Sequence, residues 1–279
     1  MVLKMISTSE VTAVLIVLNN IQDIEYCMNS LIKQPIKKII VIDGGSTDGT
    51  LKKLNQYDCE IHNIGKTGLA HSRQYGSDLV DTNFTLLVDS DNVLDAECTS
   101  RLLYDVDKYN CAGVAAQKYS YFKNNILALY QEWMNSKNVN IPGEKLVIGT
   151  PALYRTNIIR KIRYDVNATI GDDTDFCYRL AKHGYQIRVG SGICYERMQN
   201  TVKGFIKKAY FYGQSDSQFF IKYREKRWNI GTHAIRNYLL KMSFYAVKDL
   251  KPTFLCIVFL YSFSRISGLY FTLLRRALI

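Results

Sequence analysis

Two aspartates, Asp89 and Asp91, are the residues of this chain best placed to do chemistry. They end the stretch FTLLVDSDN at residues 84–92, so both acids come where a buried apolar strand would run out. In open α/β sheets, ligands bind beyond the carboxyl ends of such strands. Carboxylates suit Mg²⁺ or Mn²⁺, which bind proteins through one or two carboxylates and leave other positions to substrate phosphates. The pattern predicts a metal–diphosphate site, and a solvated acidic loop is the alternative.

A second acidic cluster, Asp172, Asp173 and Asp175, precedes a helical pattern that stops at Gly184. A helix dipole stabilises carboxylates in the first turn, so one acid is explained as a cap. Three acids within four residues exceed what a cap needs. Their mutual repulsion would raise the pKa of one of them, as a general base requires.

The elements that must position these acids follow from the hydrophobic pattern. The β-branched runs at residues 11–18 and 38–43 flank a helical pattern at 21–33, which makes a βαβ unit. Further strands are expected at 60–64, 84–89, 113–119, 145–150 and, as a strand pair, 186–196. Helices are expected up to residue 79, at 94–106, at 157–163 and before Gly184. The chain is therefore predicted to be an α/β protein with a mostly parallel sheet.

Two loops are candidate ligand loops. In residues 44–50 the glycines permit a tight turn, and Ser46 or Thr47 is expected to cap the next helix. Lys66 and Arg73 flank a predicted helix start, where backbone N–H groups favour a diphosphate. The alternative for each is an ordinary surface cation. Neither loop fits a dinucleotide-binding Gly-x-Gly-x-x-Gly or a P-loop.

The charge divides the chain into two predicted domains. The net charge is +11, and residues 1–200 are balanced while residues 201–279 hold 14 Lys and Arg against 3 Asp and Glu. The same segment holds 17 of the 34 aromatic residues. We therefore expect a catalytic domain over 1–200 and a basic, aromatic, helical tail over 201–279, and a tail of this composition points to an anionic surface.

The end of this tail is apolar. Residues 253–274 are long enough to span a bilayer, but Arg265 near the middle would cost about 2.5 to 3.5 kcal/mol, so an interfacial or re-entrant helix competes with a span. Upstream cations interleaved with aromatic residues suit lipid headgroups. Nucleic acid is the rival partner and is not expected; packing against the body or a second subunit, as a homo-oligomer, is a further alternative.

The compartment is indicated by seven scattered cysteines without a Cys-x-x-Cys pair, which fit free thiols in a reducing environment. Residues 1–10 show no long apolar core, so no secretory signal is expected. The predicted location is the cytoplasmic side of the cell membrane, with peripheral or C-terminal attachment.

Six motifs follow one another along the chain: VLIVLNN, VIDGGSTDGT, GLAHSR, VDSDN, GTPALYR and GDDTDFCYRL. Together they resemble the motifs of inverting glycosyltransferases of family 2, which have the Rossmann-like GT-A fold. The similarity covers about residues 11–230.

The resemblance implies a role for each matching residue. Val17 and Asp43 match the nucleobase contacts, and Arg73 lies where a basic residue reads the nucleotide. Asp89 matches the acid near the ribose and metal, Asp91 the direct metal ligand, and Asp173 the catalytic base. Gly149 opens the segment that lines the donor sugar.

Three positions depart from the family pattern. Asp172 stands where the family usually has Glu, which shortens an acceptor contact by one methylene. Glu196 stands near the place of a frequent metal-binding His and is at best a substitute ligand. Arg224 replaces the Gln of the Gln-x-x-Arg-Trp motif of processive synthases, which argues against processivity.

The resemblance implies transfer of a sugar from a UDP- or GDP-sugar to an acceptor hydroxyl, with inversion and with Mg²⁺ or Mn²⁺ as cofactor. Membrane attachment suggests a lipid-linked or glycan acceptor. Two alternatives remain. A haloacid-dehalogenase-type phosphatase would use Asp89 as nucleophile and Asp91 as acid/base. A non-catalytic protein would bind a sugar nucleotide or a partner without turnover.

Overall fold

The computed structural model of the chain describes residues 10–168 and 170–278, which form two compact units. The described part of unit 1 runs up to residue 121 and from 135 to 197. Unit 2 comprises residues 122–134 and those from 198 onward. The sequence analysis divided the chain near residue 200 and did not separate 122–134 from the first domain. Residues 1–9, which carry most of the expectation about a secretory signal, lie outside the described residues.

Unit 1 is built on one sheet with the strand order β3-β2-β1-β4-β8-β6-β9-β5, and β7 pairs with β9. The strands are β1 (Val11–Val17), β2 (Lys38–Asp43), β3 (Glu60–Asn63), β4 (Phe84–Asp89), β5 (Asn92–Leu94), β6 (Gly113–Ser120), β7 (Gly143–Lys145), β8 (Ala152–Arg155) and β9 (Ile187–Glu196). The four strands from β3 to β4 are parallel, as are β6 and β9, whereas β8 runs antiparallel between β4 and β6. The predicted α/β class with a mostly parallel sheet is confirmed.

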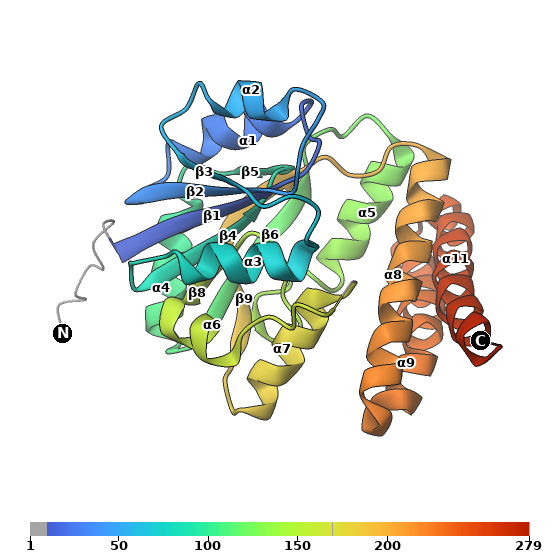
Figure 1. Cartoon of the computed structure of the whole chain (residues 1–279). Helices are drawn as coiled ribbons and strands as arrows, with labels where there is room; N and C mark the ends of the chain where they lie inside the picture. Colours follow the sequence, from blue (N-terminus) through green and yellow to red (C-terminus); the bar gives the residue numbers. More distant parts are fainter. Residues whose placement is uncertain (1–9, 169, 279) are drawn as a thin grey trace. The chain divides into compact units, whose positions relative to one another are not determined.

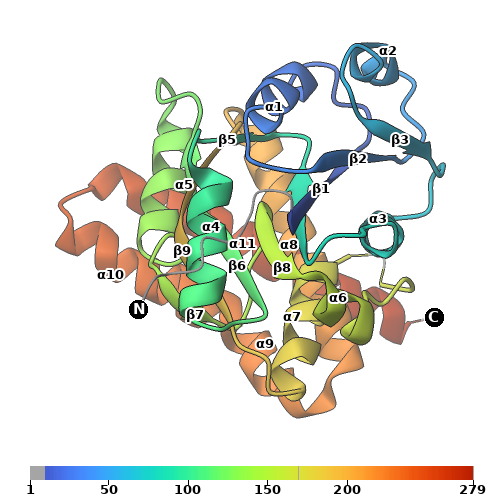
Figure 2. The same cartoon turned by 90° about the vertical axis from the view of Figure 1, so that its left-hand side faces the viewer.

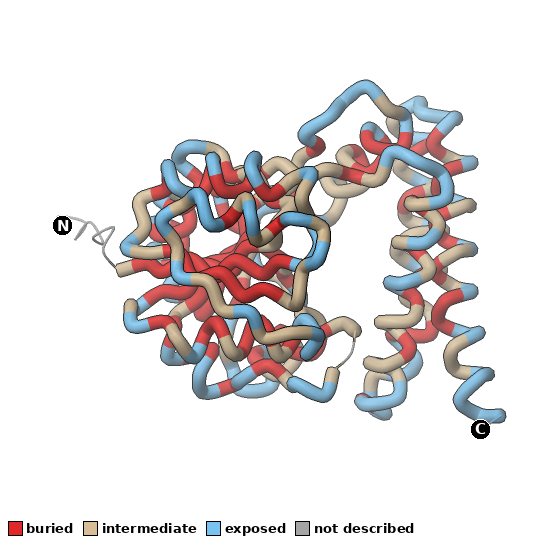
Figure 3. Tube along the Cα trace, turned by 45° about the horizontal axis from the view of Figure 1, so that its top comes forward, coloured by how far each residue is buried: buried red, intermediate tan, exposed pale blue. Residues whose placement is uncertain are grey.

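Helices cover both faces of this sheet (Figure 1). They are α1 (Ile24–Leu31), α2 (Thr50–Leu54), α3 (Leu69–Asp78), α4 (Cys98–Lys108), α6 (Thr156–Ile162) and α7 (Asp172–Lys182). Successive side chains of a strand face opposite ways, so Leu15 packs with α1 and α4 while Ile16 packs with the layer of α3, α6 and α7. Figure 2 shows α3 and α6 side by side on that second face. The strands between the layers are buried, as Figure 3 shows, and form a rigid base for the loops at their carboxyl ends.

Three strand or helix predictions were wrong. The run at 145–150 is no strand beyond Lys145, because Leu146 is 83% exposed and the next strand, β8, begins at Ala152. Residues 186–196 form one strand, β9, rather than a pair, and its pairing with β6 shifts register between Ala115 and Gln117. The helix expected from residue 94 begins at Cys98.

The late start of α4 has a local cause. Residues 92–94 pair with β9 as β5 instead of entering the helix.

The predicted cap of α2 was also wrong. Asp48 accepts the Thr50 N–H, while the Ser46 hydroxyl accepts the Asn19 N–H and so ties its loop to the one after β1.

Unit 2 is helical and has its own core. Its elements are α5 (Ile126–Ser136) up to residue 134, α8 (Val202–Lys222), the short helices η2 (Arg224–Lys226), α9 (Arg227–His233) and η3 (Ala234–Leu240), then α10 (Lys241–Lys248) and α11 (Pro252–Ala277). Aromatic residues from α5, α8 and α11 meet around Tyr130, whose ring centroid lies 5.9 Å from Phe205 and 5.5 Å from Phe254. This cluster explains why residues 122–134 join unit 2, because Tyr130 is fully buried there.

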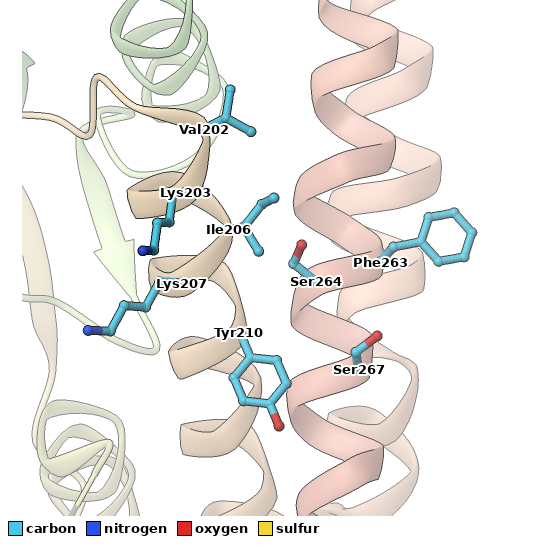
Figure 4. A pocket seen from close by; sticks show the side chains of 8 residues that line it. All are labelled: Val202, Lys203, Ile206, Lys207, Tyr210, Phe263, Ser264 and Ser267. Atoms are coloured by element: carbon cyan, nitrogen blue, oxygen red, sulfur yellow. The ribbon is translucent and has the colours of Figure 1, made fainter.

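Two glycines let α8 and α11 approach closely. A Cβ at Gly213 would lie 2.0 Å from the Arg265 carbonyl oxygen, and one at Gly268 would lie 2.1 Å from that of Tyr210. A groove borders this contact, and Figure 4 shows Tyr210 facing α11 while Lys207 extends away from it. Larger residues at either glycine would force the two helices apart.

The charge in the middle of α11 is neutralised inside this helix pair. Arg265 donates from Nε and Nη2 to the two carboxylate oxygens of Asp216 on α8, at 2.7 and 2.9 Å. The guanidinium also lies 4.6 Å from the ring centroid of Tyr238. By length and composition alone α11 could cross a membrane, which is weak evidence for a span, and 44% of its most apolar window is buried within the structure.

We predict that Asp216→Ala destabilises unit 2 by about 3 kcal/mol, because a bidentate, largely buried arginine then loses its partner. The loss is measured by hydrogen exchange across α8 and α11. The double variant Asp216→Leu/Arg265→Leu removes both charges and should recover most of the stability, whereas equal destabilisation in both variants would contradict an ionic role for the pair.

Candidate active site

The ends of β1, β2 and β4 bring three of the predicted site residues to one edge of the sheet. Val17 pairs with Asp43, and Asp89 pairs with Ile16, the neighbour of Val17. Because parallel strands share the same carboxyl edge, the loops that follow them converge here. This convergence was expected from the apolar runs.

Asp43 organises the loop after β2. Its side chain is fully buried and accepts the N–H groups of Gly45 at 2.9 Å and of Ser46 at 3.0 Å. Gly45 has a φ of 90°, which an L-residue adopts only with strain. It also lies close to Gly65, since a Cβ built on Gly45 would be 3.4 Å from the Gly65 Cα. The exposed Lys66 is thereby held beside this loop.

Arg73 is the centre of the candidate site. Its side chain is 2% exposed, and its guanidinium contacts three carboxylates from two distant segments. Nη1 donates to Asp172 at 2.6 Å and to Asp173 at 2.5 Å, while Nη2 donates to both oxygens of Asp89 at 3.1 and 3.2 Å. Thr150 Oγ1 donates to Asp89 from the far side at 2.5 Å. The two acidic motifs therefore meet, and a cation joins them.

The surroundings of Asp89 and Asp173 shift the pKa values of these two acids in opposite directions. Burial alone would raise the pKa of Asp89, but Arg73 and Thr150 outweigh it and hold this pKa below its ordinary value. Burial raises the pKa of Asp173 to about 7; Arg73 opposes this rise, and Asp172 and Asp89 add to it. Asp173 keeps 29% of its side chain exposed, so its carboxylate remains accessible to a substrate. A low-pKa acid and a high-pKa acid within one cluster are suited to different roles.

Asp91 and Glu196 lie at the neighbouring end of the site. The pairing of Asn92 with Glu196 places the residue after Asp91 directly opposite Glu196 in the sheet. The Glu196 carboxylate is 3.1 Å from the ammonium of Lys118 on β6. Among the residues that the structure describes, no group of three or more His, Cys, Asp and Glu side chains is arranged to hold a metal ion.

Gly149 lies between these two groups of charges. A Cβ built on it would be 3.8 Å from Asp173 Oδ2 and 3.9 Å from Lys118 Nζ. The glycine leaves this space free of side-chain atoms.

Sequence reasoning missed two residues, Thr150 and Lys118. Thr150 was passed over inside the GTPALYR motif, and its role depends on a contact with a distant strand. Lys118 could have been found from the sequence, because a lysine within a mostly apolar strand needs a partner for its charge.

Comparisons with known proteins identify the family and the fold of the chain. The model of the family "Glycosyl transferase family 2" matches residues 12–171. Similar solved structures include the crystal structure of S. aureus TarS, with a TM-score of 0.51, 16% identity, and coverage of 76% of this chain and 43% of that chain. The crystal structure of S. aureus TarS 1-349 has a TM-score of 0.53, 14% identity, and coverage of 92% and 90%. At such identities the likeness concerns the fold alone. A search of curated proteins gave no match.

We predict that Arg73→Met lowers the free energy of unfolding of unit 1 by about 3 kcal/mol at neutral pH, because three neighbouring carboxylates then lose their shared cation. Without the cation their pKa values rise, so protonation relieves the repulsion and the deficit relative to the unsubstituted chain should shrink as the pH falls toward 5. Urea unfolding at several pH values measures this.

The matched control is Arg101→Met, which removes an exposed arginine paired with Glu97 on α4. It should change stability little at any pH. An Arg73→Met deficit that is independent of pH would contradict the electrostatic account.

Proposed function

Because this chain belongs to glycosyl transferase family 2, we propose that it transfers a sugar from a nucleoside-diphosphate sugar to an acceptor hydroxyl with inversion at the anomeric carbon. The observation that carries the proposal is the meeting of Asp89 and Asp173 around Arg73 beyond the carboxyl ends of the strands. Family membership supports a donor and an acceptor. The identity of each is part of the proposal.

In this reaction Asp173 acts as the general base. Its carboxylate takes the proton of the acceptor hydroxyl while the oxygen forms a bond to the anomeric carbon. The bond from that carbon to the diphosphate oxygen breaks, and its electron pair leaves with the nucleoside diphosphate. Attack opposite the leaving group inverts the configuration. The raised pKa of Asp173 suits a base, and Arg73 fixes its orientation.

Charge stabilisation at the leaving group is assigned to a divalent ion. The residues present fit Mg²⁺ or Mn²⁺ held by Asp91 together with donor phosphates, since such ions need only one or two protein carboxylates. When bound, the ion neutralises the charge that develops on the diphosphate. Glu196 does not fit the role of ligand while its carboxylate pairs with Lys118.

The remaining residues bind the two substrates. The loops after β1 and β2 form the nucleoside side, with Val17 and Asp43 beneath it and Lys66 at its rim. In this proposal a uracil or guanine N–H donates to Asp43. The carboxylate is fully buried and accepts the backbone N–H groups of its own loop, so binding of the base requires that loop to shift. Asp172, bonded to Arg73, borders the acceptor, and Gly149 leaves room for the donor sugar.

The phosphatase alternative finds little support. Its nucleophile, Asp89, has its oxygens engaged by Arg73 and Thr150. The acids that it would require at the end of a strand, Asp172 and Asp173, instead begin helix α7.

Unit 2 attaches the enzyme to an anionic membrane, and the acceptor is lipid-linked. On α11 the exposed residues Phe259, Phe263, Phe271 and Leu274 recur at helical spacing along one face. Arg265 faces the interior of the bundle, so the helix offers an apolar stripe without a charge in its middle. With the basic charge of residues 201–279, this stripe supports interfacial attachment.

We predict that the protein transfers sugar from a UDP- or GDP-sugar in the presence of Mn²⁺, and that Asp173→Asn lowers kcat by about 10² to 10⁴-fold while donor binding is retained. Because the base must be deprotonated, kcat/KM should fall as the pH drops below about 7 and level off above it. Product formation is followed by mass spectrometry and donor binding by calorimetry.

The control for this substitution is Asp107→Asn, on the exposed face of α4, which should leave kcat unchanged. Sugar-nucleotide binding with no transfer to any lipid or glycan acceptor would favour the non-catalytic alternative. Full activity of Asp173→Asn would remove the base from the mechanism.

Flotation tests the membrane proposal. The protein should rise with vesicles that contain anionic lipid and stay behind with neutral ones, and Phe263→Asp/Phe271→Asp should weaken the association at least tenfold. Tyr104→Asp, an exposed aromatic on α4, is the control. Failure to float with anionic vesicles, combined with a stable dimer in sedimentation, would instead assign the stripe to a second copy.

A further inference from the structure

Lys118 is a half-buried cation next to the candidate site. It lies near the carboxyl end of β6, and its side chain is 20% exposed. The ammonium contacts Glu196 Oε2 at 3.1 Å, and the Glu196 side chain is 13% exposed. A charge pair this far removed from water is costly to bury, so the position calls for an explanation.

The backbone of Lys118 is held in place from both sides. Asn140 accepts the Lys118 N–H and donates to the Lys118 carbonyl, each at 2.7 Å. Asn140 is itself buried. A register shift between β6 and β9 immediately before Gln117 sets which residues of β6 face Glu196. The lysine is therefore placed by the fold and is not a flexible surface side chain.

The surroundings keep Lys118 charged. Burial alone would lower its pKa, but Glu196, Asp91 and Asp89 outweigh burial and raise it above its ordinary value. The fixed positive charge thus stands beside the two acids assigned to the metal and donor end of the site.

The ammonium also borders the reaction space. Lys118 Nζ and Asp173 Oδ2 approach the same point beside Gly149, at 3.9 and 3.8 Å from a Cβ built there. An acceptor oxygen bound to Asp173 and a diphosphate bound to Lys118 would therefore both reach the space beside Gly149, where the proposed function places the donor sugar.

On the basis of the function proposed above, we propose that Lys118 binds the donor diphosphate and stabilises the charge of the departing nucleoside diphosphate, and that Glu196 positions this lysine instead of ligating the metal. When the sugar–oxygen bond breaks, the diphosphate gains one negative charge. A preformed ammonium in a water-poor site stabilises that charge without reorganisation. The lysine stays protonated throughout.

The proposal makes donor binding depend on two cations that can be removed separately. The metal is removed with EDTA or by Asp91→Ala, and the ammonium by Lys118→Met. In EDTA, the unsubstituted protein should retain measurable affinity for UDP or GDP, and Lys118→Met should weaken it about tenfold or more, as for loss of a charge-assisted contact. Binding of the free nucleoside, which carries no phosphate, should be the same in both proteins. Calorimetry measures all of these affinities.

Metal affinity tests the role of Glu196 without turnover. In Mn²⁺ titrations followed by electron paramagnetic resonance, Asp91→Ala should lose binding in the presence of UDP, whereas Glu196→Gln should retain it. In kinetics with saturating Mn²⁺ and donor, Lys118→Met should lower kcat about 10²-fold or more. Lys118→Arg, which keeps the charge, should recover part of this loss.

Lys118→Met leaves a buried carboxylate without its cation, so Lys118→Met/Glu196→Gln serves as a second variant that is free of this strain. If either variant that folds binds UDP or GDP in EDTA as tightly as the unsubstituted protein, the inference is wrong. Loss of Mn²⁺ in Glu196→Gln equal to that in Asp91→Ala also overturns it. In both cases sugar transfer by the unsubstituted protein persists. Absence of both transfer and nucleotide binding in the unsubstituted protein overturns the proposed function, and the inference with it.

Discussion

The candidate site depends on one guanidinium that is shared among three carboxylates. Arg73 is bonded to Asp172, which lies 99 residues away along the chain, and to Asp89, which lies 16 residues away. Without a cation at this point, the end of β4 and the start of α7 would repel each other, because like charges in a poorly hydrated site raise each other's energy steeply. The chain topology brings the two segments together, and a cation must also balance their charge for them to stay there. The buried position of Arg73 on α3 in turn requires the close packing of that helix against β1 and β2, where a Cβ at Gly76 would collide with Val14.

Charge balance explains how such a site can receive an anionic donor. The cluster contains the carboxylates Asp89, Asp91, Asp172, Asp173 and Glu196, whereas Arg73 and Lys118 are the cations that pair with members of this set. The acids exceed the cations, so in the proposed function a diphosphate that arrives without a metal ion has only the Lys118 ammonium to bind and is held more weakly than one that carries the ion. In the proposed function, a divalent ion that the diphosphate carries supplies the missing positive charge and draws the donor to the Asp91 end. In unit 2 a largely buried charge is also balanced by a partner, because Arg265 pairs with Asp216.

The sequence predicted the parallel strands, and the shared edge at which Asp43 and Asp89 lie, because both follow from local signals. A β-branched run identifies β1, β2 and β4 directly, and the acids at their ends share an edge by the rules of parallel sheets. The run at 145–150 failed because strand propensity does not reveal whether a partner strand is present, and Leu146 faces solvent. That α5 belongs to unit 2 could not be predicted from the sequence either. It depends on the packing of Tyr130 against residues more than 70 positions later in the chain. The contact of Arg73 with the acids was missed for the same reason: its charge suggested a nucleotide, and only the fold reveals its nearer partners.

The ion pair explains why a glutamate is tolerated at position 196 and why a lysine is tolerated at position 118. The resemblance to family 2 leads one to expect a histidine near the end of β9, a ligand that is neutral when it holds a metal. Glutamate at this place adds a negative charge to a site that already has an excess of them, so the substitution alone would be unfavourable. The ammonium at 3.1 Å removes that cost. A protein that needed Glu196 as a metal ligand would gain nothing from a lysine that competes for the same oxygen. In the role proposed for Lys118, the two residues act together, and the Glu196 carboxylate holds the positive charge of the lysine in place.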